Sequence, residues 1–149
     1  MKATAPIVAV DTREHKPYRF ARSEVRTLAT GDYSVVGLED QIAIERKSQA
    51  DAYGSLGHGR ARFERELERL SRFDYAAIVI ESSLKGFLLP PAFSRLHPTA
   101  ALNSILAWSV KYGVHVFFAD DRRHANALTY QLLEKYVRYH QEKADIASE

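Results

Sequence analysis

Short apolar runs separated by polar turns occupy the first third of the chain, and their period predicts strands. Segments of this kind lie at 7–10, 25–28, 33–36 and 41–47. Turns are expected around Gly31 and Gly37, each of which stands next to or close to acidic residues. The segment at 25–28 has the weakest pattern of the four. The front of the chain therefore predicts a hairpin-like meander.

From residue 50 onward the apolar period lengthens to that of helices. Phe63, Leu67 and Leu70 form one apolar stripe, and Pro98 and Gly113 stand where a helix begins and stops. Helices are expected over 50–72 with an interruption at 54–59, over 97–113 and over 122–141, and strands at 75–80 and 114–118. Strands that alternate with helices predict an α/β fold, with one sheet covered by helices on both faces.

Composition narrows the class of protein. With 149 residues, 46% hydrophobic and 27% charged, the chain fits a single globular domain over 1–149. No run approaches the roughly 20 apolar residues that cross a bilayer, and no secretory signal is expected at the start. The absence of cysteine excludes disulfides, thiol catalysis and cysteine-bound zinc, and it suits a cytoplasmic protein. The net charge of +2 permits a nucleic-acid partner without indicating one.

Two acidic residues and a lysine gather at the end of the strand predicted over 41–47. Alternate side chains of a strand share a face, so Glu45 and Lys47 point the same way, at what is expected to be an exposed strand end. The preceding hairpin brings Asp32 to the same end, and Asp51 follows on the first helical turn. A carboxylate and an ammonium group are thus expected side by side.

Such a set suits phosphodiester hydrolysis. Mg²⁺ prefers hard oxygen ligands and takes only a few carboxylates, which leaves positions for water and phosphate. The ion polarises a phosphoryl oxygen and lowers the pKa of a bound water, while a lysine orients that water or offsets charge. Simpler interpretations stay open: Glu45 and Lys47 as a solvated edge pair, and Asp51 as a helix-capping residue.

In order along the chain, these residues resemble the nuclease domain of the XPF and Hef family, a branch of the PD-(D/E)xK superfamily. The family signature is Gly-Asp, a gap, Glu-Arg-Lys, three residues and Asp. It is matched without substitution by Gly31, Asp32, Glu45, Arg46, Lys47 and Asp51. The family's first strand ends in Val-Asp-x-Arg-Glu, as residues 10–14 do, and weaker similarity continues through 62–70 and 78–81. The resemblance implies a restriction-endonuclease-like mixed sheet with helices on both faces.

The resemblance also implies roles for individual residues. Metal ligands are expected at Asp32 and Glu45, with Asp11 and Glu14 as supporting acidic residues of the metal site. Catalytic residues are expected at Lys47, Glu45 and Asp32, with Arg46 and Asp51 as close support. The implied cofactor is Mg²⁺ or Mn²⁺.

Two departures from the family pattern limit what carries over. Many members bear a tandem helix-hairpin-helix module, for which this chain has no room, so a standalone form is expected and preference for junctions or flaps does not follow. The family places Gly-Arg directly before its aromatic residue, whereas Gly59 and Arg60 stand two residues ahead of Arg62 and Phe63. Either Arg60 or Arg62 takes the family role.

Basic residues on the helix after the signature are candidate DNA contacts. The candidates are Arg60, Arg62, Arg65 and Arg69, and Arg72 continues the stripe. They either follow a phosphate backbone or belong to a solvated face of i,i+4 pairs such as Arg62 with Glu66. The glycine-rich segment 54–59 is either a loop that orders on DNA or a linker.

The last predicted helix carries a wide apolar face, and the family resemblance implies pairing through such helices. Its stripe consists of Leu128, Leu132, Tyr136 and Tyr139, with Leu133 and Val137 beside it. Most of this stripe is expected to pack into the core, and part of it is expected to form the interface of a homodimer.

The sequence thus predicts a metal-dependent DNA endonuclease that acts at branched or flap structures in DNA repair or recombination. Two alternatives remain: a catalytically silent DNA-binding or scaffold subunit, and a fold relative that does not bind DNA. The intact Asp32, Glu45 and Lys47 argue against the silent subunit.

Overall fold

β3 and β4 lie at the centre of a mixed six-stranded sheet in the computed structural model, which describes residues 5–148. The strands are β1 (Val8–Asp11), β2 (Ser23–Arg26), β3 (Tyr33–Val35), β4 (Ile42–Ser48), β5 (Tyr75–Glu81) and β6 (His115–Phe118). The helices are α1 (Gln49–Leu56), α2 (Arg60–Leu70), α3 (Leu84–Phe87), α4 (Pro98–Tyr112) and α5 (Arg122–Ala147). No helix among these described residues is long and apolar enough to span a membrane.

The strand order is β2-β1-β3-β4-β5-β6. β3 pairs antiparallel with both β1 and β4, whereas β4, β5 and β6 run parallel. The hairpin predicted before β4 is therefore confirmed. The weak segment near 25–28 forms β2 over Ser23–Arg26, and it pairs parallel to β1 at the edge of the sheet. All four residues of β2 are exposed, which explains its faint apolar pattern.

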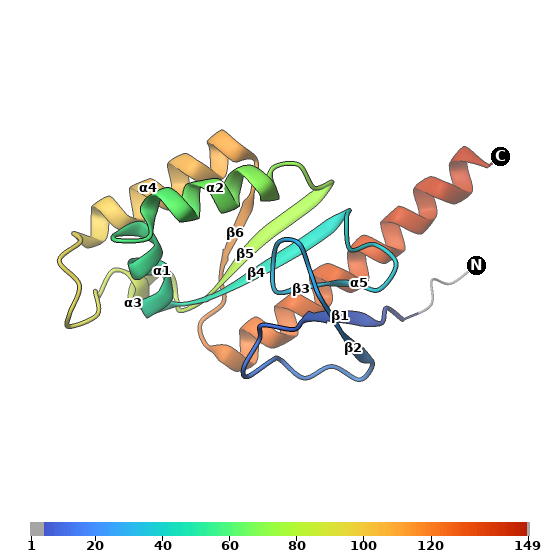
Figure 1. The fold of residues 1–149 in the computed structure, drawn as a ribbon, viewed down its shortest axis with the longest axis horizontal. Helices are drawn as coiled ribbons and strands as arrows, with labels where there is room; N and C mark the ends of the chain where they lie inside the picture. The colour runs from blue at the N-terminus through green and yellow to red at the C-terminus, as the bar shows by residue number, and fades with distance from the viewer. Residues whose placement is uncertain (1–4, 149) are drawn as a thin grey trace.

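Helices cover both faces of the sheet, as the sequence predicts. Figure 1 shows α2 and α4 on one side of the sheet and α5 on the other. The alternation of β4 divides its side chains between the two layers: Ala43 packs with the α1, α2 and α4 residues, whereas Ile42 and Ile44 pack toward α5. Glu45 and Lys47 continue the Ala43 side, so the fold directs them toward α2.

Helix boundaries differ from the predicted ones in three places. α1 continues through Gly54 to Leu56, so the break before α2 covers only 57–59 and not 54–59. The short α3 was not predicted. α5 reaches Ala147 although its apolar period ends near 141; its last turns are exposed and rich in good helix formers such as Glu142 and Lys143.

Candidate active site

Asp32 lies beside Glu45 because Gly31 makes a turn that only glycine fits well. Gly31 has a φ of +86°, and a Cβ at this position would lie 3.1 Å from the Cβ of Ala43. After the turn, the Asp32 N–H donates to the carbonyl of Ile44 at 2.9 Å, and the Asp32 carboxylate accepts from the Arg46 N–H at 2.7 Å. The predicted convergence of the hairpin and the strand end is thus present.

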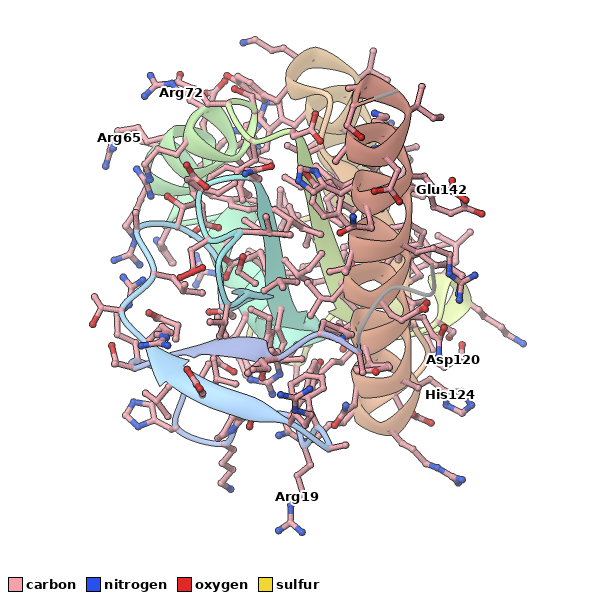
Figure 2. The ribbon with its side chains drawn as sticks, turned by 90° about the vertical axis from the view of Figure 1, so that its right-hand side faces the viewer. Arg19, Arg65, Arg72, Asp120, His124 and Glu142 are labelled. Carbon is pink, nitrogen blue, oxygen red and sulfur yellow. The ribbon has the colours of Figure 1, made fainter. Side chains whose placement is uncertain are left out.

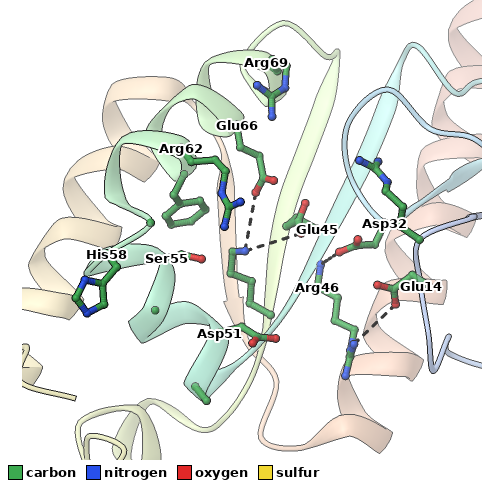
Figure 3. A pocket seen from close by; sticks show the side chains of 16 residues that line it. Glu14, Asp32, Glu45, Arg46, Asp51, Ser55, His58, Arg62, Glu66 and Arg69 are labelled. Carbon is green, nitrogen blue, oxygen red and sulfur yellow. Dashed lines mark hydrogen bonds and ion pairs between the residues drawn. The ribbon is translucent and has the colours of Figure 1, made fainter. Parts of the chain in front are cut away.

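Lys47 lies between two carboxylates of the cleft, Glu45 and Glu66, which are labelled in Figure 3. Its Nζ is 3.9 Å from Glu45 Oε1 and 4.0 Å from Glu66 Oε1, and it stands 4.9 Å from the centre of the Phe63 ring. The expectation of an exposed strand end is wrong. Glu45 is only 8% exposed and the Lys47 side chain 12%, because α2 covers the end of β4 with Phe63 and Glu66.

Glu66 is a site residue that sequence reasoning missed as such. Its Oε1 is buried and accepts no hydrogen bond within the described part of the chain. Glu66 follows Phe63 by three residues, so both lie on the face of α2 that meets the sheet. That spacing places Glu66 at the border of the buried stripe and is a signal for its position, although not for its chemistry.

Burial and neighbouring charges raise the pKa of two carboxyl groups of the cleft, Glu45 and Glu14. Burial raises the pKa of Glu45 well above its usual range, the charges of Asp32 and Glu66 raise it further, and Lys47 acts in the opposite direction. Burial and the charge of Asp32 also raise the pKa of Glu14. Three carboxylates thus face a single ammonium group in this cleft, an arrangement that a cation would relieve.

The oxygen donors fit Mg²⁺ or Mn²⁺. Mg²⁺ is commonly held by one or two carboxylates and otherwise by water and substrate phosphate. Asp32 and Glu45 can supply these two carboxylates. Glu66 lines the same cleft, and its Oε1, which accepts no hydrogen bond within the described residues, adds a further oxygen. No group of three or more His, Asp or Glu side chains within residues 5–148 is arranged to hold a metal ion by itself.

Arg46 and Glu14 form a separate network on the other face of β4. Arg46 Nε donates to Glu81 at 2.8 Å, and its Nη1 lies 3.8 Å from Glu14. Glu14 in turn accepts from the Tyr33 hydroxyl at 2.9 Å, and Tyr18 donates to Glu81 at 2.5 Å. This network fixes Glu14 and Arg46 at the rim of the cleft, and the supporting role of Arg46 stays a prediction.

Of the acidic candidates Asp11 and Asp51, only Asp51 lies at the cleft. Asp11 is buried and accepts from Arg13 Nε at 2.6 Å and from the Leu28 N–H at 2.9 Å, so it stabilises the turn after β1 and does not line the cleft. Asp51 lines the cleft. Ser48, and not Asp51, is the N-cap of α1 and accepts from the Asp51 N–H, whereas Asp51 lies in the first helical turn, where its charge suits the helix dipole.

The arginines of α2 separate into two groups. The cleft has a volume of about 670 Å³, and Arg62 and Arg69 line it. Arg60 instead stacks on Trp108 at 4.5 Å, and Arg65 points away from the molecule (Figure 2). Of the two candidates for the family role, the structure places Arg62 in the cleft.

The alternative of a salt-bridged face is not supported. Within the described residues, no ion pair involves the four arginines of the stripe, Arg62, Arg65, Arg69 and Arg72. Their cationic groups are therefore available to a polyanion.

The match to a known family decides the identity of this fold. The sequence model of the ERCC4 domain matches residues 10–132. The chain belongs to the ERCC4 domain family. The match begins in β1, includes every cleft residue described above and ends within α5, which confirms the resemblance to the XPF nuclease domain.

Two solved structures resemble this ERCC4 domain. XPF from Aeropyrum pernix is 23% identical, with a TM-score of 0.72, over 89% of this chain and 62% of that one. XPF from Aeropyrum pernix in complex with DNA is 24% identical, with a TM-score of 0.68, over 88% of this chain and 64% of that one. The ERCC4 domain thus spans less than two thirds of either XPF chain, and the likeness confirms its fold. The comparison with curated proteins finds no match.

Proposed function

We propose that this ERCC4 domain is a metal-dependent endodeoxyribonuclease that hydrolyses phosphodiester bonds. The observation that carries the proposal is the position of Lys47. Its ammonium group lies 3.9 Å from Glu45, in a cleft that Asp32 also lines, together with two arginines that form no ion pair with any residue in 5–148. A solvated edge pair would not be covered by a helix, nor would it share a cleft with further carboxylates.

Asp32 and Glu45 are the residues proposed to hold Mg²⁺ or Mn²⁺. A bound ion would polarise the phosphoryl oxygen and supply an activated water. Lys47 would donate a hydrogen bond to that water or to a phosphoryl oxygen, where it would offset the charge that develops in the transition state. Phe63 and Glu66 restrict the Lys47 side chain, so its ammonium group stays within the cleft.

The proposed substrate is DNA, at a branch, flap or single-strand to double-strand junction formed in repair or recombination. Arg62 and Arg69 stand along the cleft where they can neutralise phosphates on either side of the reacting one. The relative from Aeropyrum pernix was solved in complex with DNA, which supports DNA as the polymer bound here.

A panel of labelled linear, flap, fork and junction DNAs tests the proposal, with Mg²⁺, Mn²⁺ or EDTA in the buffer. We expect cleavage with either ion and none with EDTA. Tight binding of the same DNAs without cleavage under any condition would instead favour a silent DNA-binding or scaffold subunit. If the DNAs are neither bound nor cut, the chain is instead a fold relative without a DNA partner.

A further inference from the structure

A second groove adjoins the candidate active site. We call it the Phe93 groove; it has a volume of about 610 Å³ and lies between α1 and the connection 88–97 that leads from α3 to α4. Ala50, Gly54 and His58 line both the groove and the cleft, so the two are continuous. His58 marks the shared margin, on the side of the cleft away from Asp32 (Figure 3).

Hydrogen bonds from α1 hold the segment that leads into the outer wall of the groove. Gln49 Nε2 donates to the carbonyl oxygens of Gly86 and Leu89 at 2.8 and 2.6 Å. The buried Tyr53 hydroxyl donates to the carbonyl of Phe87 at 2.6 Å. These contacts hold residues 86–89 against α1, and the wall at 93–96 follows a few residues later.

The chemistry of the wall combines an exposed ring with positive charge. Phe93 is 82% exposed, although a phenylalanine usually buries most of its surface. Arg95 and His58 stand with it in the lining, and none of the described residues that line the groove is acidic. Aromatic platforms beside basic groups are how proteins hold single-stranded nucleic acid, since every unpaired base offers a face for stacking.

Gly54 gives an independent indication that a ligand approaches here. It lies inside α1, where glycine costs up to about 1 kcal/mol relative to alanine. Packing does not require it, because a Cβ at Gly54 would meet no atom within 4 Å. A glycine that the fold does not need, at the point shared by the groove and the cleft, suits a chain that passes closely over α1.

We propose that the Phe93 groove binds the unpaired strand of the DNA substrate, with one base stacked on Phe93 and the strand passing over Gly54 toward the cleft. The inference rests on the proposed nuclease function and adds that the groove selects substrates with an unpaired strand. A duplex is a poorer occupant than a single strand, because paired bases keep their faces within the stack.

The binding test uses the whole chain in EDTA, so that DNA is bound and not cut. Fluorescence anisotropy follows a labelled oligo-dT of about twelve nucleotides and a duplex of the same length. Phe93→Ala should weaken single-strand binding about 5- to 150-fold, the loss expected for one stacked base, and change duplex binding less than about twofold. Val110→Ala on α4, which truncates another highly exposed apolar side chain, is the matched control and should change neither.

Two further Phe93 variants separate stacking from apolar contact. Phe93→Trp keeps a ring and should bind the single strand as wild type does. Phe93→Leu keeps apolar bulk without a ring and should bind as weakly as Phe93→Ala. Full binding by Phe93→Leu, or equal binding by Phe93→Ala and wild type, overturns the proposal. A change of oligomeric state in Phe93→Ala also overturns it, since it would assign the groove to a second copy of the chain.

Substitutions at Gly54 should change stability and binding in opposite directions. Gly54→Ala and Gly54→Gln should raise the melting temperature by a few degrees, because both favour the helix. The same substitutions should weaken single-strand binding, with the larger loss for glutamine. Wild-type single-strand affinity in Gly54→Gln contradicts the path of the strand over α1.

Failure of the groove and failure of the nuclease are distinguishable. If wild type cuts flap DNA with Mg²⁺ and Phe93→Ala has the same kcat/KM on that flap, the groove proposal falls and the nuclease stands. If Phe93-dependent binding is found but no DNA is cut with either ion, the nuclease proposal falls and the groove stands.

Discussion

Glu45 is almost fully buried and faces the charges of Asp32 and Glu66, so it holds a proton more tightly than a carboxyl group in water. Its raised pKa means that ionisation of Glu45 opposes folding while no cation is bound. Between pH 4.5 and the folded-state pKa, the unfolded chain releases this proton and the folded protein retains it. Stability of the metal-free protein therefore falls as the pH rises through that window.

Glu45→Gln should accordingly stabilise the metal-free protein at neutral and alkaline pH. We expect its melting temperature in EDTA at about pH 8 to exceed that of wild type by a few degrees, since each 1 kcal/mol moves the melting temperature of a domain of this size by roughly 2–4 °C. The difference should shrink toward pH 4.5 and vanish well below it, where Glu45 is protonated in both states. Mg²⁺ should stabilise only the wild type. Equal melting curves for the two proteins at all pH values would contradict this account of the cleft.

Glu66 is expected to position Lys47 through charge. Glu66→Gln keeps the size of the side chain but removes the attraction across 4.0 Å, so Lys47 should lose its fixed place. We expect kcat for DNA cleavage to fall on the order of 10- to 100-fold with little change in KM. Glu64→Gln on the same helix is the control, because Glu64 pairs with Lys111 and Tyr112 and does not line the cleft. Equal kcat values for both variants would remove Glu66 from the site.

Sequence reasoning located the residues that a local pattern determines. Asp32, Glu45 and Lys47 follow from a turn and a strand alternation, and the structure brings all three together. The burial of Glu45 and the approach of Glu66 depend on how α2 packs over β4, and no local pattern contains that information. For the same reason the sequence could not show that Asp11 stabilises a turn outside the cleft.

At the scale of elements, α2 serves two surfaces. Phe63, Leu67 and Leu70 pack into the core, as their spacing predicts. The arginines on the rest of the helix divide between the cleft and the solvent, and this division depends on the angle at which α2 crosses the sheet. The sequence predicted the stripe correctly but not which of its members reach the cleft.

The salt dependence of DNA binding should distinguish the arginines of α2 that line the cleft from the arginine that points to solvent. Arg62→Ala and Arg69→Ala should each make the slope of log affinity against log salt shallower by about 0.9, the value for one phosphate contact. Arg65→Ala, on the same helix but pointing away, should leave the slope unchanged. Binding of a labelled duplex at several salt concentrations measures all three. Equal slopes for the three variants would show that these arginines form a solvated face and do not contact phosphates individually.

The order of elements was largely predictable because each has its own apolar period. Both central strands and the amphipathic part of α5 lie where that period places them. The pairing of β2 was not predictable, since a fully exposed edge strand has no apolar face to show its partner. The outer turns of α5 were missed because helix propensity, and not burial, extends them.

At the scale of the whole molecule, most of the apolar face of α5 packs on its own sheet. Leu128, Leu132 and Tyr136 contact the core formed with β1, β3 and β4, whereas Tyr139 and Ile146 stay exposed on the outer turns. The width of the apolar face is therefore a weaker reason for dimerisation than the sequence alone indicated. The surface that remains for a second copy is the outer part of α5.

We still predict a homodimer, through these outer turns. Light scattering at tens of micromolar should give about twice 16.9 kDa, and Tyr139→Glu with Ile146→Glu should shift the mass toward the monomer. Val110→Glu, a charge placed on exposed α4, should not. A monomeric wild type at these concentrations would rule out the dimer.

The most direct test of the central claim is the single-turnover rate of DNA cleavage by Lys47→Ala with saturating Mg²⁺, measured beside wild type on the best substrate of the panel. Lys47 lies with Glu45 in the cleft, yet it is not a proposed metal ligand, so the variant should still bind the ion in a calorimetric titration. We expect its cleavage rate to fall by roughly two to four orders of magnitude, the contribution of one catalytic electrostatic or acid-base group. Cleavage at the wild-type rate would show that the active site lies elsewhere.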